Sequence, residues 1–114
     1  MYQVIMMYGD TEPWWFLEGW EEDIIESHLF QTYDGALKEY RCLSNQFSKK
    51  YEHQETRKGC LTAFWNSGEE KWCEECGEFL QQFRSVMLVQ LDESTPNGYQ
   101  KREKGRRVKP CMLK

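Results

Sequence analysis

The chain has 114 residues, of which 39% are hydrophobic and 30% are charged, and its formal net charge is −4. This length and mixture are typical of one folded domain and exclude an intrinsically disordered chain. No apolar run approaches the roughly 20 residues that cross a bilayer. Residues 1–8 have neither a basic leader nor a small-residue cleavage site, so we expect a cytoplasmic protein with no membrane partner.

The charges are distributed unevenly along the chain. Residues 1–34 carry eight acidic side chains and no Lys or Arg. Residues 35–60 carry six basic and three acidic side chains, and residues 101–114 carry seven basic side chains and one acidic one. A polyanion would therefore be repelled by the first part of the chain and attracted by the other two.

The first third of the sequence predicts strands. Residues 2–8 are almost continuously apolar and rich in β-forming side chains, as in a strand that is covered on both faces. Gly9 and Asp10 break this pattern, and we expect a short strand at residues 14–17, followed by a turn. Residues 24–30 fit either a strand or the start of a helix, and we favour a strand.

The clearest predicted element is an amphipathic helix at residues 33–51, which Thr32 or Asp34 would cap. Its apolar side chains recur at steps of three and four residues and form one stripe, which consists of Tyr33, Leu37, Tyr40, Leu43 and Phe47. Basic side chains lie on the opposite side, so the helix is expected to have a basic outer face.

The second half of the sequence alternates strands with polar segments. Residues 51–59 are polar and predict a loop, and residues 60–66 predict a strand. Ser67 and Gly68 favour a turn, after which residues 70–73 are expected to return as a hairpin partner. The segment at residues 79–91 contains a further buried strand.

These elements predict an α+β fold: a small antiparallel or mixed sheet of four to five strands with one main amphipathic helix, plus a basic C-terminal tail. We expect a single domain at residues 1–92, with a disordered linker and tail at residues 93–114. The side chains expected in the core of the sheet are Val4, Ile5, Phe64, Val86 and Leu88.

Two blocks of the sequence resemble a known family. Residues 1–23 end in Glu-Pro-Trp-Trp-Phe-Leu-Glu-Gly-Trp-Glu-Glu-Asp, and residues 63–82 begin Ala-Phe-Trp-Asn-Ser-Gly-Glu-Glu-Lys-Trp-Cys-Glu-Glu-Cys. Both are similar to a bacterial family known as domain of unknown function 1033, over roughly residues 1–92. The resemblance implies no established activity and no settled site residues, although many members carry a DNA-binding label. The basic tail lies outside it.

The motif Cys73-Glu-Glu-Cys76 has three interpretations. A structural zinc ion needs four ligands in a tetrahedron, and the best set in this chain is Cys60, Cys73, Cys76 and His53. A redox pair is disfavoured, because the surrounding glutamates would stabilise the protonated thiol rather than the thiolate. The interpretation we favour is that two small thiols pack at the end of a strand, without a cofactor.

Residues 11–23 combine large aromatic side chains with acids, and most of the rings are expected in the core. Trp14 and Trp15 are adjacent, so they cannot both point inward from a strand, and one of them is expected to be exposed or covered by a loop. An exposed tryptophan among acids suits a protein partner at least as well as a nucleic acid. Trp14, Trp15 and Trp20 are therefore the candidate partner-binding residues.

A non-catalytic function is expected, because the sequence contains no phosphate-binding glycine loop, nucleophile elbow or His-Glu-x-x-His motif. No small-molecule substrate is inferred. DNA binding ranks first only through the resemblance, and the protein-interaction reading is level with it on physical grounds. The candidate nucleic-acid-binding residues are Lys38, Arg41, Lys49, Lys50, Arg57, Lys58, Lys101, Arg102, Arg106 and Arg107.

Overall fold

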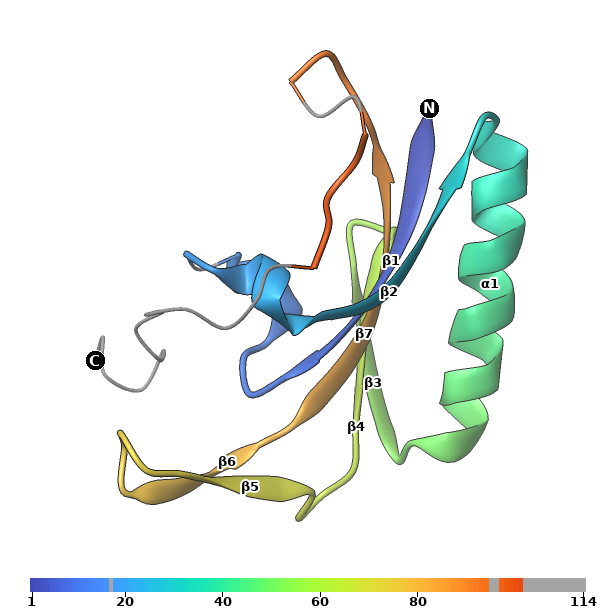
Figure 1. Ribbon diagram of the computed structural model, residues 1–114. Helices are drawn as coiled ribbons and strands as arrows, with labels where there is room; N and C mark the ends of the chain where they lie inside the picture. The colour runs from blue at the N-terminus through green and yellow to red at the C-terminus, as the bar shows by residue number, and fades with distance from the viewer. Residues whose placement is uncertain (17, 95–96, 102–114) are drawn as a thin grey trace.

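The computed structural model describes residues 1–16, 18–94 and 97–101, which form an α+β fold (Figure 1). Five antiparallel strands make one sheet in the order β2-β1-β7-β4-β3. The bounds of these strands are β1 Tyr2–Gly9, β2 Ile24–Phe30, β3 His53–Arg57, β4 Leu61–Trp65 and β7 Phe83–Gln90. A separate hairpin pairs β5, Glu70–Cys73, with β6, Glu78–Gln81. The predicted fold class is confirmed.

The helix α1, Tyr33–Lys50, covers one face of the five-stranded sheet (Figure 1). The Thr32 hydroxyl caps its start by accepting a hydrogen bond from the Gly35 N–H at 3.1 Å. At the other end, Lys49 and Lys50 lie in the last turn, where cations interact favourably with the helix dipole. No helix in the described ranges has the length and apolar character needed to cross a membrane.

The main core lies between α1 and the sheet. Alternate side chains of β1, β4 and β7 face the helix, and the buried residues of this layer are Val4, Met6, Ala36, Tyr40, Phe47, Phe64, Val86 and Leu88. The Tyr40 hydroxyl lies 2.7 Å from Thr62 Oγ1, which in turn lies 2.8 Å from Thr56 Oγ1. This chain of hydroxyls satisfies buried polar groups inside the apolar layer, and burial raises the pKa of Tyr40.

The opposite side of the five-stranded sheet, here called the open face, has no α-helix over it among the described residues. Two short 3₁₀ helices, η1 at Pro13–Trp15 and η2 at Trp20–Asp23, pack there instead. They cover a second buried cluster of Ile5, Met7, Ile24, Leu61 and Met87. This face is therefore closed by aromatic side chains and short turns rather than by regular structure.

Residues 97–101 also pack against the open face. Gln3, which is buried on β1, donates from Nε2 to the Tyr99 carbonyl at 2.7 Å and accepts from the Tyr99 N–H at 2.8 Å. Gly98 allows this close approach, because its φ is +77° and a Cβ at that position would lie 2.6 Å from Gln3 Oε1. Domain contacts thus continue beyond the predicted boundary at residue 92. Residues 102–114, most of the predicted tail, lie outside the described residues.

Three local predictions were wrong. Residues 14–17 were expected to form a strand, but Pro13–Trp15 is a 3₁₀ helix, since proline fixes a helical φ at its start. The predicted loop at residues 51–59 contains β3, an exposed edge strand with no apolar side chain to reveal it. Residues 70–73 do form a strand, but it pairs with β6, while the strand at residues 61–65 pairs with β3 and β7.

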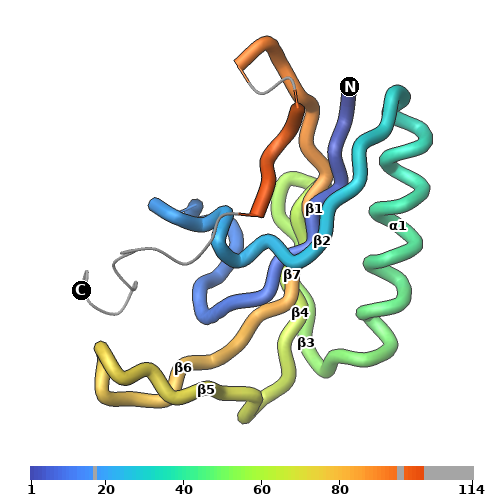
Figure 2. Tube along the Cα trace, in the orientation of Figure 1, coloured from blue at the N-terminus to red at the C-terminus, as the bar shows by residue number. Residues whose placement is uncertain are grey.

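The β5–β6 hairpin extends away from the five-stranded sheet, beside the 3₁₀ helices (Figure 2). The Gln81 side chain anchors its base, because Nε2 donates to the carbonyls of Asn66 and Glu69 at 2.9 and 3.0 Å. Near its tip, Trp72 and Phe79 are 54% and 61% exposed and make an edge-to-face ring contact at 5.1 Å. The hairpin thus places a second exposed aromatic pair away from the sheet.

Candidate functional site

The strongest candidate site is a group of rings on the open face, here called the aromatic surface, which consists of Trp14, Trp15, Phe16, Trp20 and Tyr99. The 3₁₀ helix η1 turns Trp14 towards the sheet and leaves Trp15 61% exposed. The chain then reverses at Phe16, which has φ 47° and ψ 50° and is 43% exposed. The two adjacent tryptophans were expected not to both point inward, and of the two alternatives for the second ring the structure shows the exposed one, although the local structure is not a strand.

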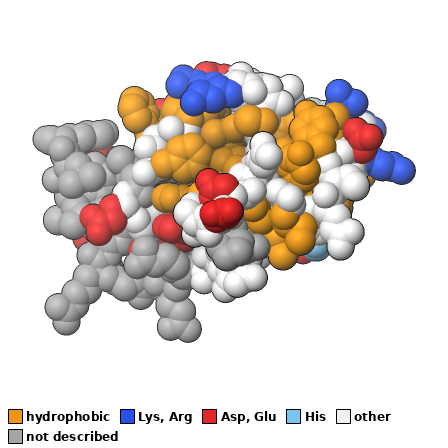
Figure 3. Space-filling view, turned by 90° about the horizontal axis from the view of Figure 1, so that it is seen from above, with side chains coloured by type: hydrophobic (Ala, Val, Ile, Leu, Met, Phe, Trp, Pro, Cys, Tyr) orange, Lys and Arg blue, Asp and Glu red, His pale blue; other side chains and the backbone are white. Residues whose placement is uncertain are grey.

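Three rings of the aromatic surface, Phe16, Trp20 and Tyr99, contact one another in sequence. Phe16 meets Trp20 edge-to-face at 5.2 Å between ring centroids, and Trp20 meets Tyr99 at 5.2 Å. Beside them lies a shallow groove of about 330 Å³, lined by Phe16, Trp20, Met87, Val89 and Tyr99. A view from above shows hydrophobic side chains gathered across the middle of the described part of the molecule, with acidic side chains among them and Lys and Arg towards the margins (Figure 3).

Trp14 connects the aromatic surface to the edge strand β3. The Arg57 guanidinium lies 3.9 Å from the centroid of the Trp14 ring, a cation–π arrangement. Arg57 also pairs with Glu55 at 2.7 Å. Trp14 Nε1 is buried and has no hydrogen-bond partner among the described residues. Arg57 is therefore engaged with the aromatic surface, on the side of the sheet that faces away from α1.

The candidate nucleic-acid-binding residues are not brought together into one surface. Lys38, Arg41, Lys49 and Lys50 are exposed on α1, and Lys58 lies in the turn between β3 and β4. Arg57 points to the opposite face of the sheet, against Trp14. The Lys101 ammonium donates to the backbone carbonyls of Glu22 and Ile24 at 3.2 and 3.1 Å. Arg102, Arg106 and Arg107 lie outside the described residues.

The four candidate zinc ligands are also not assembled. His53 begins β3 and Cys60 follows its end, so the two lie at opposite ends of the β3–β4 hairpin. The His53 Nε2 lies 2.9 Å from Ser67 Oγ, and its ring stacks on Trp65. The sulfur atoms of Cys73 and Cys76 are 2.8 Å apart at the turn of the β5–β6 hairpin. Within the described part of the chain, no group of three or more potential ligands is placed to hold a metal ion.

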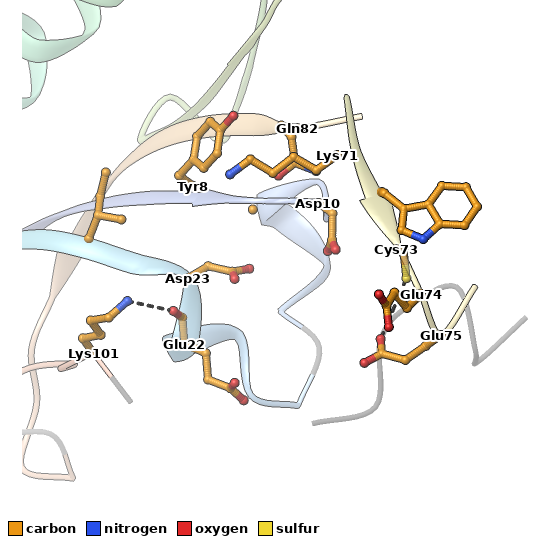
Figure 4. Close-up of a pocket in the computed structure, with 13 residues that line it drawn as sticks. Tyr8, Asp10, Glu22, Asp23, Lys71, Cys73, Glu74, Glu75, Gln82 and Lys101 are labelled. Atoms are coloured by element: carbon orange, nitrogen blue, oxygen red, sulfur yellow. Dashed lines mark hydrogen bonds between the residues drawn. The ribbon is translucent and has the colours of Figure 1, made fainter. Parts of the chain in front are cut away.

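A second, larger pocket of about 520 Å³ lies between η2 and the β5–β6 hairpin (Figure 4). It is lined by five carboxylates together with two lysines and the Cys73 thiol; the carboxylates are Asp10, Glu22, Asp23, Glu74 and Glu75. Tyr8 closes one side, and burial, together with a hydrogen bond to the Glu69 carboxylate, raises the pKa of Tyr8 to about 12. The pocket gathers acids from two segments that are distant in the sequence.

Sequence reasoning identified three of the five rings of the aromatic surface as partner-binding residues, but missed Phe16 and Tyr99. It also missed the groove residues Met87 and Val89, because their place on the open face depends on which face of β7 the helix covers. The one available signal was an isolated aromatic, Tyr99, directly after the turn-forming Pro-Asn-Gly. Such a ring in a polar segment indicates that the segment packs against the domain.

Comparison with known proteins gives one match. A family model described as a protein of unknown function, DUF1033, matches residues 1–112. This match confirms the resemblance seen in the two tryptophan-rich blocks and extends it over the basic tail, which the sequence analysis had placed outside. No curated protein and no solved structure matches the chain.

Proposed function

We propose that this chain, which belongs to the DUF1033 family, is a non-catalytic protein-binding module. The description of the family assigns no activity, so the proposal rests on the geometry of the surface. The aromatic surface docks a segment of a partner protein that carries apolar anchor residues between basic ones. The observation that supports this most directly is the exposure of the adjacent rings of Trp15 and Phe16, 61% and 43%, of which Phe16 lines an apolar groove.

Exposed rings at a groove provide a large driving force for docking. Covering one large apolar side chain contributes about 1.5–3 kcal/mol relative to leaving it in water. Tryptophan is also enriched among the few residues that contribute most of the binding free energy of protein interfaces. Trp15 and Phe16 are placed to act as such anchors, since neither is needed to fill the two buried clusters.

The backbone at Phe16 supports the same interpretation. An αL conformation at a residue other than glycine costs on the order of 1–2 kcal/mol, and Phe16 adopts it with φ 47°. Strained residues of this kind concentrate at binding sites, where they fix a side chain in a functional direction. Here the conformation holds the Phe16 ring against Trp20 and beside the groove.

The charges around the aromatic surface determine which partner it suits. Glu12, Glu18 and Glu21 are spaced through the segment that carries the rings, and Glu12 accepts a hydrogen bond from Trp15 Nε1 at 3.4 Å. Such a rim repels the phosphates of a nucleic acid and attracts Lys and Arg. A basic polypeptide with apolar anchors therefore fits this surface better than DNA does.

A titration with three probes tests this function. The probes are a short peptide combining Lys and Arg with Leu and Met, the same peptide with each basic residue replaced by Glu, and a short single-stranded oligonucleotide. We expect only the basic peptide to quench the tryptophan fluorescence in a saturable way. Trp15→Ala should weaken that binding about tenfold or more, since truncating an interface anchor costs roughly 2 kcal/mol or more.

The matched control is Trp72→Ala, which removes another exposed tryptophan, 54% exposed, from the β5–β6 hairpin. This control should bind the basic peptide as the parent chain does. Binding of the oligonucleotide alone, or equal affinities of the parent chain and Trp15→Ala for the basic peptide, would contradict the proposal.

A further inference from the structure

The strand β2 forms one edge of the five-stranded sheet (Figure 1). It pairs only with β1 among the described strands, and at its start the Lys101 ammonium donates to the Ile24 carbonyl at 3.1 Å. Proteins usually protect such an edge with lysine, proline or a covering segment. The sequence of β2, Ile-Ile-Glu-Ser-His-Leu-Phe, contains no Lys, Arg, Pro or Gly. By contrast, the other edge strand, β3, is polar throughout and carries Glu55 and Arg57.

The side chains of β2 are exposed on both faces of the sheet. Ile25 and Leu29, two apolar residues of this edge strand, are 46% and 49% exposed. Glu26 and His28 lie opposite Met6 and Val4, two residues of the helix-facing core, so they point to the α1 side. Their side chains approach to 3.6 Å and remain about half exposed. The edge therefore presents two apolar side chains, Ile25 and Leu29, on either side of the hydrogen-bonding pair Glu26 and His28, with Ser27 at the centre.

This pattern is complementary to itself. If two copies of β2 pair antiparallel about a twofold axis at Ser27, Glu26 lies opposite His28 of the second copy, and Ile25 lies opposite Leu29 of the second copy. The axis repeats each pair, so acid meets imidazole twice and apolar meets apolar twice. Cross-strand pairs of these kinds stabilise a sheet, whereas like charges directly opposite one another destabilise it. Ile25 is the extra residue of a bulge in β2, because Met6 lies opposite Glu26 and Met7 lies opposite Ile24, so regular pairing with a second copy would end at Ile25.

The position of α1 allows this pairing. The helix packs mainly over β7 and β1, set back from the β2 edge. Neighbouring strands lie about 4.8 Å apart, so two helices centred over the two β1 strands would be about 14 Å apart. Packed helices need only about 8–10 Å. The second copy therefore extends the sheet without a clash between helices.

We propose that β2 is a self-association edge, at which two copies of this chain pair antiparallel about Ser27 to form one continuous ten-stranded sheet. This inference is independent of the proposed docking function, because the aromatic surface lies on η1, η2 and residues 97–101 rather than on β2. Ten strands follow from two copies of the five-stranded sheet. The isologous contact closes the assembly at two chains, because each sheet uses its β2 edge once.

Sedimentation equilibrium with a charge-swap series tests the pairing. The parent chain should show concentration-dependent mass between 13.8 kDa and twice that value. His28→Glu places carboxylates opposite one another and should raise the dimer dissociation constant about tenfold or more, since like charges then meet in both cross-strand pairs. The double variant Glu26→Lys with His28→Glu places opposite charges in both pairs and should recover dimerisation.

Two controls separate the interface from general effects. Gln54→Glu introduces the same charge at the β3 edge and should leave the dissociation constant unchanged, and so should Trp15→Ala on the aromatic surface. A parent chain that remains at 13.8 kDa up to millimolar concentration would overturn the proposal. So would His28→Glu dimerising as tightly as the parent.

Disulfide trapping tests the register even if His28→Glu folds poorly. Directly opposed residues in antiparallel strands have Cα atoms about 4.5–5.5 Å apart, within the range that a disulfide spans. Ser27→Cys should therefore form a covalent dimer on oxidation with diamide, beyond the background of the parent chain's own cysteines. Leu29→Cys should not, because it faces Ile25 rather than itself. Equal trapping of both variants would contradict a twofold axis at Ser27.

Discussion

At the residue scale, Tyr8 connects the five-stranded sheet to the β5–β6 hairpin. Its hydroxyl donates to the Glu69 carboxylate, and the cations of Lys71 and Arg84 lie 4.8 and 5.2 Å from its ring centroid. Burial, the hydrogen bond and the charge of Glu69 raise the pKa of Tyr8 from 10.0 to about 12. The folded protein thus holds the phenol proton more tightly than the unfolded chain does.

This pKa difference predicts how stability depends on alkaline pH. Because the pKa of Tyr8 is higher in the folded state, its stabilising contribution is complete below pH 10.0 and is lost as the pH rises towards about 12. The parent chain should therefore lose stability over this interval, and Tyr8→Phe should lose less. Urea midpoints measured between pH 9 and 12 test this. An identical decline in both proteins would contradict the assignment.

At the element scale, the β5–β6 hairpin depends on the loop that joins it to the sheet. A two-stranded hairpin alone is marginally stable in water. Its base is fixed by Gln81, which bonds to two carbonyls of the preceding loop, and by the Gln82 N–H, which donates to the Glu69 carbonyl at 2.8 Å. The hairpin is therefore expected to open locally while the five-stranded sheet remains folded.

Gln81→Ala tests this local anchoring. Removal of its side chain leaves the Asn66 and Glu69 carbonyls without that donor, at a cost of roughly 1–2 kcal/mol. Hydrogen exchange of the β5 and β6 amides should accelerate about tenfold, while the amides of β1 and β7 keep their protection. Gln54→Ala, an exposed glutamine on β3, is the matched control and should change neither. Uniform acceleration over all strands would show that the hairpin and the sheet open together.

Element prediction from the sequence succeeded where a periodic pattern was long and failed where pairing was decided by tertiary structure. The stripe from Tyr33 to Phe47 located α1, and the apolar run at residues 2–8 located β1. The strand β3 has no apolar residue, so only its pairing with β4 defines it. The turn residues after residue 66 predicted a hairpin between β4 and the strand that follows it. In the structure β4 instead pairs with β7, which begins eighteen residues after β4 ends.

At the scale of the whole molecule, the two sides of the five-stranded sheet have different roles. One side is closed by a regular amphipathic helix, and this layer was predictable residue by residue from Val4, Phe64 and Val86. The open face is closed by two 3₁₀ helices and by residues 97–101. The Trp14–Trp15 pair pointed to an exposed ring in this region, but the sequence did not show which rings lie together. Placing Tyr99 beside Trp20 required the Gln3 contact, which joins residues 96 positions apart.

The central claim, that the aromatic surface binds a basic polypeptide, is tested most directly by following the five tryptophan indole N–H signals by NMR. Addition of the basic, apolar-anchored peptide should shift the signals of Trp15 and Trp20 progressively to saturation. The signals of Trp65 and Trp72, outside this surface, should stay in place. Shifts confined to Trp72, or to the amides of Lys38 and Arg41 on α1, would contradict the account.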